Sequence, residues 1–306
     1  MLYKQNHRLA SAYILASGFM FALMGAGIKL VSNDVSTELV VFFRNLFGFI
    51  VILPFVLRNG VSGLRTKIPL WHIARSLAGL GAMYCFFYSI AHIPLSESVL
   101  LSYTTPLFAP ILAYLFLRET VTRSLIYAIM LGFVGVTFLL NPDFETFSWV
   151  ALVALCSGMF AALAMTCIRR MSTSEPASLV IFYYGLICTA VSAIPLMGIP
   201  VVDAFFFNMS GREVIPLPDN NSILILFGVG VFATLGQFCL TRGYSMAAVA
   251  QVGPFMYSTV VFATVLGWFF WQEMPTLFSG FGIILVVIAG SIALRKSGVI
   301  VVSERN

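Results

Sequence analysis

Three basic side chains lie inside long apolar stretches of the sequence, where a charge is costly. They are Lys29, Arg44 and Arg75. A charge at the centre of a bilayer costs at least about 2.5–3.5 kcal/mol on insertion scales, so each residue needs a reason to be there. Lys29 and Arg75 are close enough to the ends of their stretches for a long side chain to reach a polar interface. Arg44 lies deeper, about 7.5 Å from the edge of its stretch by helical rise.

The two arginines could recognise an anion. A guanidinium binds carboxylate and phosphate groups through paired hydrogen bonds, and no acidic residue lies among these cations to neutralise them. Arg44 could instead reach the interface or form an ion pair with Glu38 or Glu97, and Arg75 could extend to the nearer interface. We therefore treat both arginines as candidate substrate-binding residues.

One acidic residue, Glu97, stands at the start of an apolar stretch. A carboxylate there is stabilised by the dipole of the helix that follows, which makes capping its simplest role. Its functional alternative is a gating or coupling acid that binds a proton or a cation. Apart from Glu119 and Glu273, which end two other stretches, no carboxylate is near a plausible pathway. Proton coupling, exchange against a counter-substrate and facilitated diffusion are all compatible with this pattern.

Polar and aromatic side chains recur at depth in the apolar stretches. Tyr84 and Tyr88 are four residues apart and share one helix face. A polar group buried in lipid must find a partner, so such side chains either bond between helices or face a substrate. Phenol rings can stack on a planar or cationic group and orient it by their hydroxyls. The remaining candidates for substrate binding are Tyr103, Thr105, Gln237, Tyr257 and Ser258. Pro106 is a candidate for gating.

The composition defines the class of protein. Of the 306 residues 60% are hydrophobic and only 9% are charged, with a mean hydropathy of +0.98. A soluble chain carries roughly 25% charged residues, so most of this chain must face lipid. The net charge of +5 then indicates basic loops rather than a nucleic-acid partner. The five cysteines and three histidines show no metal-ligand or catalytic spacing, so we expect no metal, no cofactor and no enzyme activity.

Ten segments are long and apolar enough to be membrane-spanning helices, which predicts an all-α membrane protein. A β-barrel is disfavoured because the apolar runs are continuous and do not alternate. The ten predicted spans are Leu9–Val31, Leu39–Leu57, Trp71–Ala91, Ser98–Leu117, Ser124–Leu140, Trp149–Ile168, Leu179–Met197, Ile223–Thr241, Val249–Trp271 and Leu277–Leu294.

The basic residues between these spans predict the orientation of the chain. With the N-terminus in the cytoplasm, thirteen of the seventeen Lys and Arg residues fall in cytoplasmic segments, and only Arg212 falls outside. Cytoplasmic loops carry such an excess of Lys and Arg. We therefore predict that both termini are cytoplasmic, with residues 295–306 as a cytoplasmic tail, and that the protein lies in a bacterial cytoplasmic (inner) membrane.

The chain contains an internal repeat. When residues 95–119 are moved by 154 positions onto residues 249–273, seven residues coincide, where roughly two or three are expected from composition. This register predicts two five-helix units, residues 9–140 and 149–294. An odd number of helices in each unit makes the two units cross the membrane in opposite directions. Inverted repeats give many transporters two mirror-related states, each open to one side.

Several motifs resemble those of a known family. The run Ser89–Leu101, followed by Leu117–Thr120, is similar to the region around helix four in the EamA family of the drug/metabolite transporter superfamily. The second half has weaker versions in Ser245–Gln251 and Gln272-Glu273. The resemblance implies ten helices in two repeats and a central cavity lined mainly by helices one, three, four, six, eight and nine. The first half also resembles the branch that contains S-adenosylmethionine carriers.

The expected function is secondary active transport of small metabolites, such as amino-acid-like solutes, by alternating access. The alternative is a carrier or exchanger of organic anions or of S-adenosylmethionine-type metabolites that uses Arg44 and Arg75. The expected partners are a small-molecule substrate, the lipid bilayer and either a coupling proton or a counter-substrate. A membrane scaffold is the competing class, which measurement of substrate flux would distinguish.

Overall fold

The chain folds into a bundle of helices. The computed structural model describes residues 7–31, 34–58, 64–90, 92–93, 95–119, 121–140, 149–194, 196, 218–272 and 276–295. Over these residues the elements are α1 (His7–Val31), α2 (Thr37–Leu57), α3 (Pro69–Ile90), α4 (Leu95–Ser102), α5 (Thr105–Leu117), α6 (Arg123–Leu140), α7 (Trp149–Met171), α8 (Ala177–Ala193), α10 (Asn220–Met246), α11 (Val249–Val252), the 3-10 helix η3 (Gly253–Tyr257), α12 (Ser258–Trp271) and α13 (Leu277–Arg295).

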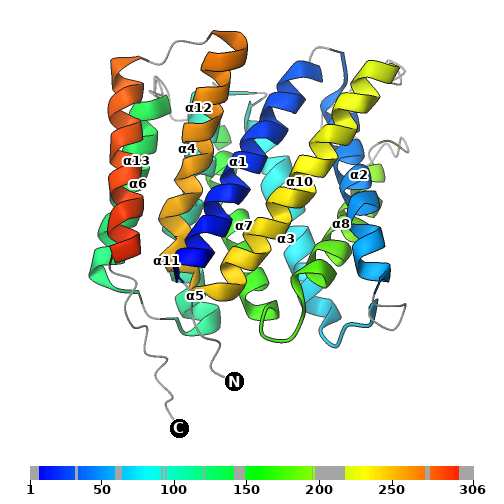
Figure 1. Cartoon of the computed structure of the whole chain (residues 1–306), viewed down its shortest axis with the longest axis horizontal. Coiled ribbons are helices and arrows are strands. Elements are labelled where there is room, and N and C mark those ends of the chain that lie inside the picture. Colours follow the sequence, from blue (N-terminus) through cyan, green and yellow to red (C-terminus); the bar gives the residue numbers. More distant parts are fainter. Residues whose placement is uncertain are drawn as a thin grey trace.

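The first turn of α1 and the last turn of α13 lie at the same end of the bundle (Figure 1). We call this end the terminal end and the opposite end the far end. In the described part of the chain, seven helical segments are long and apolar enough to cross a membrane, and α8 and most of α13 form shorter apolar helices. Large apolar side chains cover the outside of the bundle, as in α5, α12 and α13. This all-helical, apolar architecture is that of a multi-pass membrane protein.

The structure divides two of the predicted spans. The span predicted as Ser98–Leu117 breaks into α4 and α5 at Tyr103 and Thr104. Proline lacks an N–H and its ring clashes with the carbonyl four residues earlier, so Pro106 removes the helical hydrogen bond to Ser102 and favours a break there. The freed carbonyl of Ser102 accepts a hydrogen bond of 2.8 Å from the Thr105 hydroxyl instead. The ninth predicted span is likewise interrupted, by the 3-10 segment around Pro254.

Two other spans differ in length from the prediction. Helix α10 extends from Asn220 to Met246, beyond the predicted Ile223–Thr241. Its start is set by Asp219, whose carboxylate accepts a hydrogen bond of 3.0 Å from the Ser222 amide and so caps the first turn. Hydrogen bonds from the Ser222 side chain and from its amide lower the pKa of Asp219. Helix α8 ends at Ala193, and the predicted end at Met197 lies outside the described residues.

The same 154-residue offset relates the boundaries of the two broken helices and the starts of the helices that follow them. Helices α4 and α11 begin at Leu95 and Val249, and α6 and α13 begin at Arg123 and Leu277. Helices α5 and α12 each end in a left-handed cap. These caps are Arg118 and Gln272, with φ of 54° and 57°, and among the described residues they are the non-glycine positions with positive φ. The local backbone thus follows the register that the residue matches predict.

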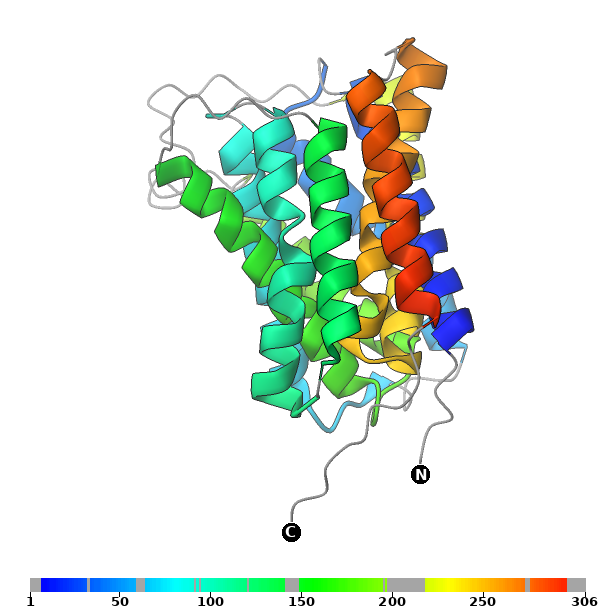
Figure 2. The same cartoon turned by 90° about the vertical axis from the view of Figure 1, so that its left-hand side faces the viewer.

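Helix pairing in the bundle is also symmetric between the two halves. Helix α1 packs along α10 as α3 packs along α7, and α2 contacts α10 as α8 contacts α3. Helix α1 contacts α12 as α7 contacts α5. In two further pairs, α2 with α8 and α6 with α13, a helix of the first half contacts the helix at the equivalent position of the second half. Figure 2 shows α6 and α13 side by side at one face of the bundle.

We expect Gly282→Ala to destabilise the protein, because α6 and α13 touch through glycine. A Cβ at Gly282 would lie 2.5 Å from the Gly135 carbonyl oxygen and 2.6 Å from the Leu139 nitrogen, both backbone atoms that cannot move aside. Overpacking of this kind costs about 1–3 kcal/mol. The measurement is the thermal unfolding midpoint of the purified protein in detergent. Gly280→Ala is the matched control, because a Cβ at Gly280 meets nothing within 4 Å; an equal loss in both variants would contradict the prediction.

Candidate substrate-binding site

Arg75 is buried between α3, α8 and α10. Arg75 lies four residues, about one helical turn, before Gly79 in α3, and it is 4% exposed. Its Nη2 donates a hydrogen bond of 2.8 Å to Oε1 of Gln237 on α10, and its guanidinium lies 3.8 Å from the ring centroid of Tyr184 on α8. A Cβ at Gly79 would lie 2.8 Å from Nη1 of Arg75 and 3.0 Å from the Tyr184 ring. The glycine thus makes room for the stacked pair.

Arg44 on α2 lines a cavity together with Tyr184 and Gln237. Its Nη1 donates to Oδ1 of Asn45 at 3.1 Å, and its other contacts are to sulfur atoms, with Nε 3.3 Å from Met24 and Nη1 3.7 Å from Met83. A thioether is a weak acceptor, so much of the hydrogen-bonding capacity of this guanidinium is poorly used. We predict from this that Arg44 has donors available for a ligand.

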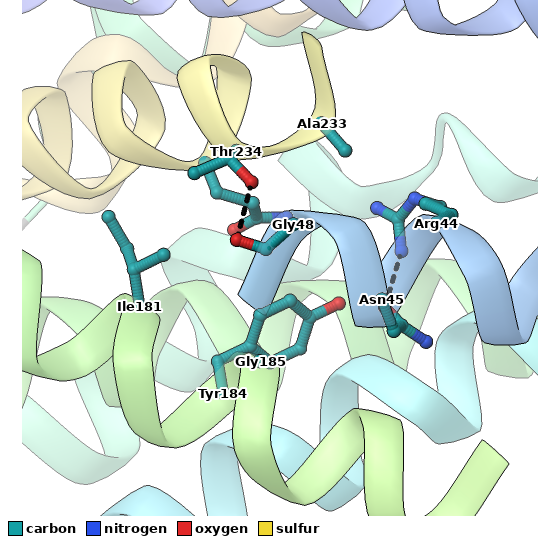
Figure 3. A pocket seen from close by; sticks show the side chains of 9 residues that line it. Arg44, Asn45, Gly48, Ile181, Tyr184, Gly185, Ala233 and Thr234 are labelled. Carbon is teal, nitrogen blue, oxygen red and sulfur yellow. Dashed lines mark hydrogen bonds between the residues drawn. The ribbon is translucent and has the colours of Figure 1, made fainter. Parts of the chain in front are cut away.

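A small cavity lies beside Arg44 and is also lined by Tyr184 and Gln237, the two residues that Arg75 contacts. It has a volume of about 20 Å³, which is room for a single water, and lies among α2, α8 and α10. In Figure 3 the ring of Tyr184 lies below Gly48, and its hydroxyl end points toward Arg44 and Asn45. Thr234 closes the other side, where its hydroxyl donates to the Gly48 carbonyl at 3.1 Å. Gln237 lines this cavity together with Arg44, and its Oε1 accepts the hydrogen bond from Arg75.

The charge of this cluster is not balanced by the described side chains. Neither Arg44 nor Arg75 has a carboxylate partner among them, and Nε of Arg75 is buried without a hydrogen bond. Buried charges are normally paired, because an unpaired charge in an apolar interior is strongly destabilising. Two guanidiniums without a carboxylate partner among the described side chains, together with an amide and a phenol, are chemically suited to bind an anionic group. The sequence predicts both arginines as candidates; in the structure Arg75 contacts Tyr184 and Gln237, and Arg44 lines a cavity with the same two residues.

The other predicted aromatic residues lie in two different places. Tyr84 on α3 is half-buried and packs with Tyr184 and Cys188, beside the arginine cluster. Tyr88 lies one turn further toward the far end, where its ring is 4.3 Å from the ring of His92 and 5.5 Å from that of Trp149. Only Tyr84 therefore adjoins the arginines.

Tyr103 and Tyr257 pack in one apolar cluster, together with residues of α6 and α13. Tyr257 is completely buried, and its hydroxyl donates to the Ile129 carbonyl at 3.3 Å. Its ring packs on Gly132, where an added Cβ would come within 2.5 Å of the ring. In this conformation Tyr257 has no surface exposed to a ligand, whereas Tyr103 is only partly buried.

The predicted hydroxyl residues lie at the two helix breaks. Ser258 donates to the Phe255 carbonyl at 2.7 Å, as Thr105 donates to that of Ser102. Pro106 is buried in the first turn of α5 and faces Gly253 of the second break, at 3.5 Å from a Cβ placed there. The Thr105 hydroxyl bonds to the Ser102 carbonyl, which the missing N–H of Pro106 leaves free, whereas the Phe255 carbonyl also accepts a hydrogen bond from the Ser258 backbone N–H.

Two further candidates need separate mention. The backbone of Glu97 belongs to α4, but its side chain lies outside the described residues. Lys29 is near the far end of α1, with Nζ 4.6 Å from the ring centroid of Trp271. This contact agrees with the expectation that Lys29 extends toward the end of its helix.

An ion pair connects the two halves at the terminal end. Oε1 of Glu119, just after α5, accepts a hydrogen bond of 2.9 Å from Nε of Arg169 on α7. Oε2 of Glu119 accepts from the Val249 amide at 3.1 Å, at the start of α11. Arg169 also donates to the Ser245 carbonyl at 3.1 Å. We call these contacts the Glu119–Arg169 latch, since they connect α5, α7 and α11 at this end.

Sequence reasoning missed the partners that complete the arginine cluster. Tyr184 and Thr234 were not predicted, although each is a polar residue within an apolar helix and would satisfy the criterion used for Gln237. It also missed the proximity of His72 to Glu175, whose Nε2 and Oε2 atoms are 3.9 Å apart although the residues are 103 positions apart. Such pairs depend on the packing of α3 against α7 and α8, which one-dimensional periodicity does not contain.

Comparison with known proteins identifies the family. The model of the EamA-like transporter family matches residues 8–141 and 148–295. The chain is 31% identical over 292 residues to the pseudopaline exporter of Pseudomonas aeruginosa, covering 94% of this chain and 97% of the exporter. It is 27% identical to the S-adenosylmethionine uptake transporter of Rickettsia felis, with 88% of each chain covered. A crystal structure with 19% identity has the same fold, with a TM-score of 0.77 over 93% of this chain and 96% of that one. The chain therefore belongs to the EamA-like transporter family.

Proposed function

We propose that the protein is a secondary active carrier of small metabolites that bear a carboxylate or similar anionic group, with Arg44 and Arg75 holding that group. The observation that carries this proposal is that Arg75 contacts Tyr184 and Gln237 while Arg44 lines a cavity with the same two residues, and that neither guanidinium has a carboxylate partner among the described side chains. Amino-acid-like solutes and organic anions share this anionic group, so the proposal includes both substrate classes expected from the sequence.

The names of the relatives support transport of a small metabolite but do not identify the substrate of this chain. One is an exporter of pseudopaline and another takes up S-adenosylmethionine, so relatives of similar sequence work in opposite directions. We propose transport of a small metabolite for this chain on that basis. Its direction is a property to be measured.

We further propose alternating access between two inverted five-helix repeats, residues 9–140 and 149–294. Three observations support it: the 154-residue offset of the helix boundaries, the symmetric helix pairing, and the two separate ranges matched by the family model. In this proposal the chain crosses a bacterial inner membrane ten times with both termini in the cytoplasm. The terminal end is then the cytoplasmic end, closed in this conformation by the Glu119–Arg169 latch.

The remaining predicted residues take different roles in this proposal. Tyr84 and Gln237 belong to the substrate site with the arginines, and Tyr88 lies toward its far-end entrance. The residues at the helix breaks, Tyr103, Thr105, Pro106, Tyr257 and Ser258, form the bending points. A helix interrupted by proline can bend there without losing further backbone hydrogen bonds, which suits a gating role for Pro106.

The test begins with a panel of metabolites scored for thermal stabilisation of the purified protein, because a ligand that binds the folded state raises its apparent stability. We expect anionic and zwitterionic compounds to stabilise the wild-type protein. The best ligand is then used as a radiolabelled substrate for flux into proteoliposomes. Cationic compounds that lack an acidic group are the matched negative set.

Arg44→Gln is expected to weaken competition by anionic ligands about tenfold, the effect of losing one charge-assisted hydrogen bond. Arg123→Gln is the control, because Arg123 is an exposed arginine at the start of α6. If the variant is folded and its selectivity among anionic and zwitterionic ligands equals that of the wild type, Arg44 does not bind the substrate.

A further inference from the structure

We propose that His72 is a proton-binding site coupled to the arginine cluster, so that an anionic substrate and a proton bind together. This inference rests on the proposed function, since it assigns the coupling ion of the same site. It concerns residues that the sequence pattern does not connect: His72 on α3 and Glu175 between α7 and α8.

The first observation is the burial of His72 without a hydrogen bond. The residue is 1% exposed, and neither ring nitrogen has a hydrogen-bond partner. Its ring packs on Tyr183, with ring centroids 4.5 Å apart. A buried imidazole whose two nitrogens are unsatisfied is costly, and most buried polar groups in proteins are paired. The position is therefore explained better by a function than by stability.

The second observation is the carboxylate beside it. Oε2 of Glu175 is 3.9 Å from Nε2 of His72, and the Glu175 side chain is only 5% exposed. The other oxygen, Oε1, accepts hydrogen bonds from the Thr66 hydroxyl at 2.8 Å and the Lys67 amide at 3.4 Å. The carboxylate is thus held in place by hydrogen bonds at Oε1, and its Oε2 is the oxygen near the imidazole. A proton on His72 would convert this contact into a buried ion pair.

The third observation is that Arg75 lies three residues after His72 in α3, and so on the same side of the helix. The other titratable or charged groups around this position, on the elements that pack against α3, are Cys167 and Arg170 on α7 and Tyr183 and Cys188 on α8. Arg170 is exposed and its guanidinium lies 5.9 Å over Trp71. Glu175 and Arg75 are the charges that act most directly on His72.

These two charges have opposite effects on a proton at His72. The Glu175 carboxylate stabilises the imidazolium, whereas the Arg75 guanidinium destabilises it. An anion bound at Arg75 cancels the second effect, so it increases the affinity of His72 for a proton. Linkage requires the reverse as well: a proton on His72 increases the affinity of the site for the anion. The proton and the anion then cross the membrane in the same direction with a smaller net charge.

The test measures the titration of His72 directly, in the full-length protein in lipid nanodiscs with labelled histidine observed by NMR from about pH 4 to about pH 9. Arg75→Gln imitates neutralisation by a bound anion and is expected to raise the His72 titration midpoint by about one unit or more. Glu175→Gln is expected to lower it by a similar amount. His92, which is exposed at the far end, is the internal control and should not move.

The proposal is overturned if neither substitution moves the His72 midpoint more than it moves that of His92, or if the two substitutions move it in the same direction. It is also overturned if His72 does not titrate in any of the three proteins. His72→Gln, compared by thermal unfolding, shows whether the residue has only a structural role. These measurements need no substrate, so failure of the anion-transport proposal in the flux assay would be recognised separately.

Discussion

Arg75→Gln is expected to reduce substrate flux in proteoliposomes by about 10- to 100-fold while leaving the thermal unfolding midpoint unchanged or higher. A hydrogen bond to a charged group contributes about 1.5–3 kcal/mol, and each 1.4 kcal/mol is a factor of ten. Arg75 donates to Gln237 and stacks on Tyr184, so its loss removes the anchor of the anionic group and also displaces its neighbours.

The stability part of this prediction separates function from folding. A buried guanidinium without a carboxylate partner costs free energy, so a neutral side chain at this position relieves that cost even though Gln237 loses its donor. Residues retained for activity at the expense of stability commonly behave in this way. Arg123→Gln, on the surface of the same protein, should change neither quantity. A lower unfolding midpoint with normal flux per folded molecule would show that Arg75 serves the fold alone.

Glu119→Ala is expected to open the terminal end and to increase the labelling rate of Cys167 by roughly tenfold or more. The carboxylate accepts bonds from Arg169 on α7 and from Val249 at the start of α11, so its removal releases several contacts between the two halves. Charge-assisted contacts of this kind contribute about 1.5–3 kcal/mol each. Cys167 is 1% exposed and lies half a turn before Arg169, where an impermeant maleimide would enter from the terminal end.

A second cysteine shows whether this change is alternating access or loss of structure. Cys156 is half-buried in the far half of α7. If opening one end closes the other, its labelling should fall as that of Cys167 rises; general unfolding would raise both. Each cysteine is studied alone, with the other four replaced. Asp34→Asn, an exposed carboxylate at the far end, is the control and should leave both rates unchanged.

Together the two predictions divide the molecule into a binding site and a latch. Arg75 lies among α3, α8 and α10, and Glu119 lies at the terminal end between α5, α7 and α11. Transporters of two inverted repeats work by rocking around a fixed site, so changes at the site should affect affinity and changes at the latch should affect accessibility.

Hydropathy predicted the all-helical, apolar architecture, because each spanning helix must satisfy its own backbone hydrogen bonds and carry its own apolar surface. The breaks were predicted less well. The local consequence of Pro106 is clear from its chemistry, but a helix can pass a proline with only a kink. The termination at Ser102 also depends on packing against Gly158 of α7, where an added Cβ would lie 3.0 Å from the Ser102 carbonyl oxygen.

The sequence alone therefore determined the class of protein, the all-helical fold and the residues whose charges need an explanation, since these follow from composition, length and the cost of charge in lipid. The tertiary structure decided which of those residues meet. Gly48 allows α2 to approach α10 beside the Arg44 cavity, and Gly79 allows α3 to approach Tyr184 of α8, where Arg75 stacks and binds Gln237. Tyr257 lies against α6 with its hydroxyl bonded to Ile129. A helix presents a face according to its period, but its partner is set by the packing of the whole bundle.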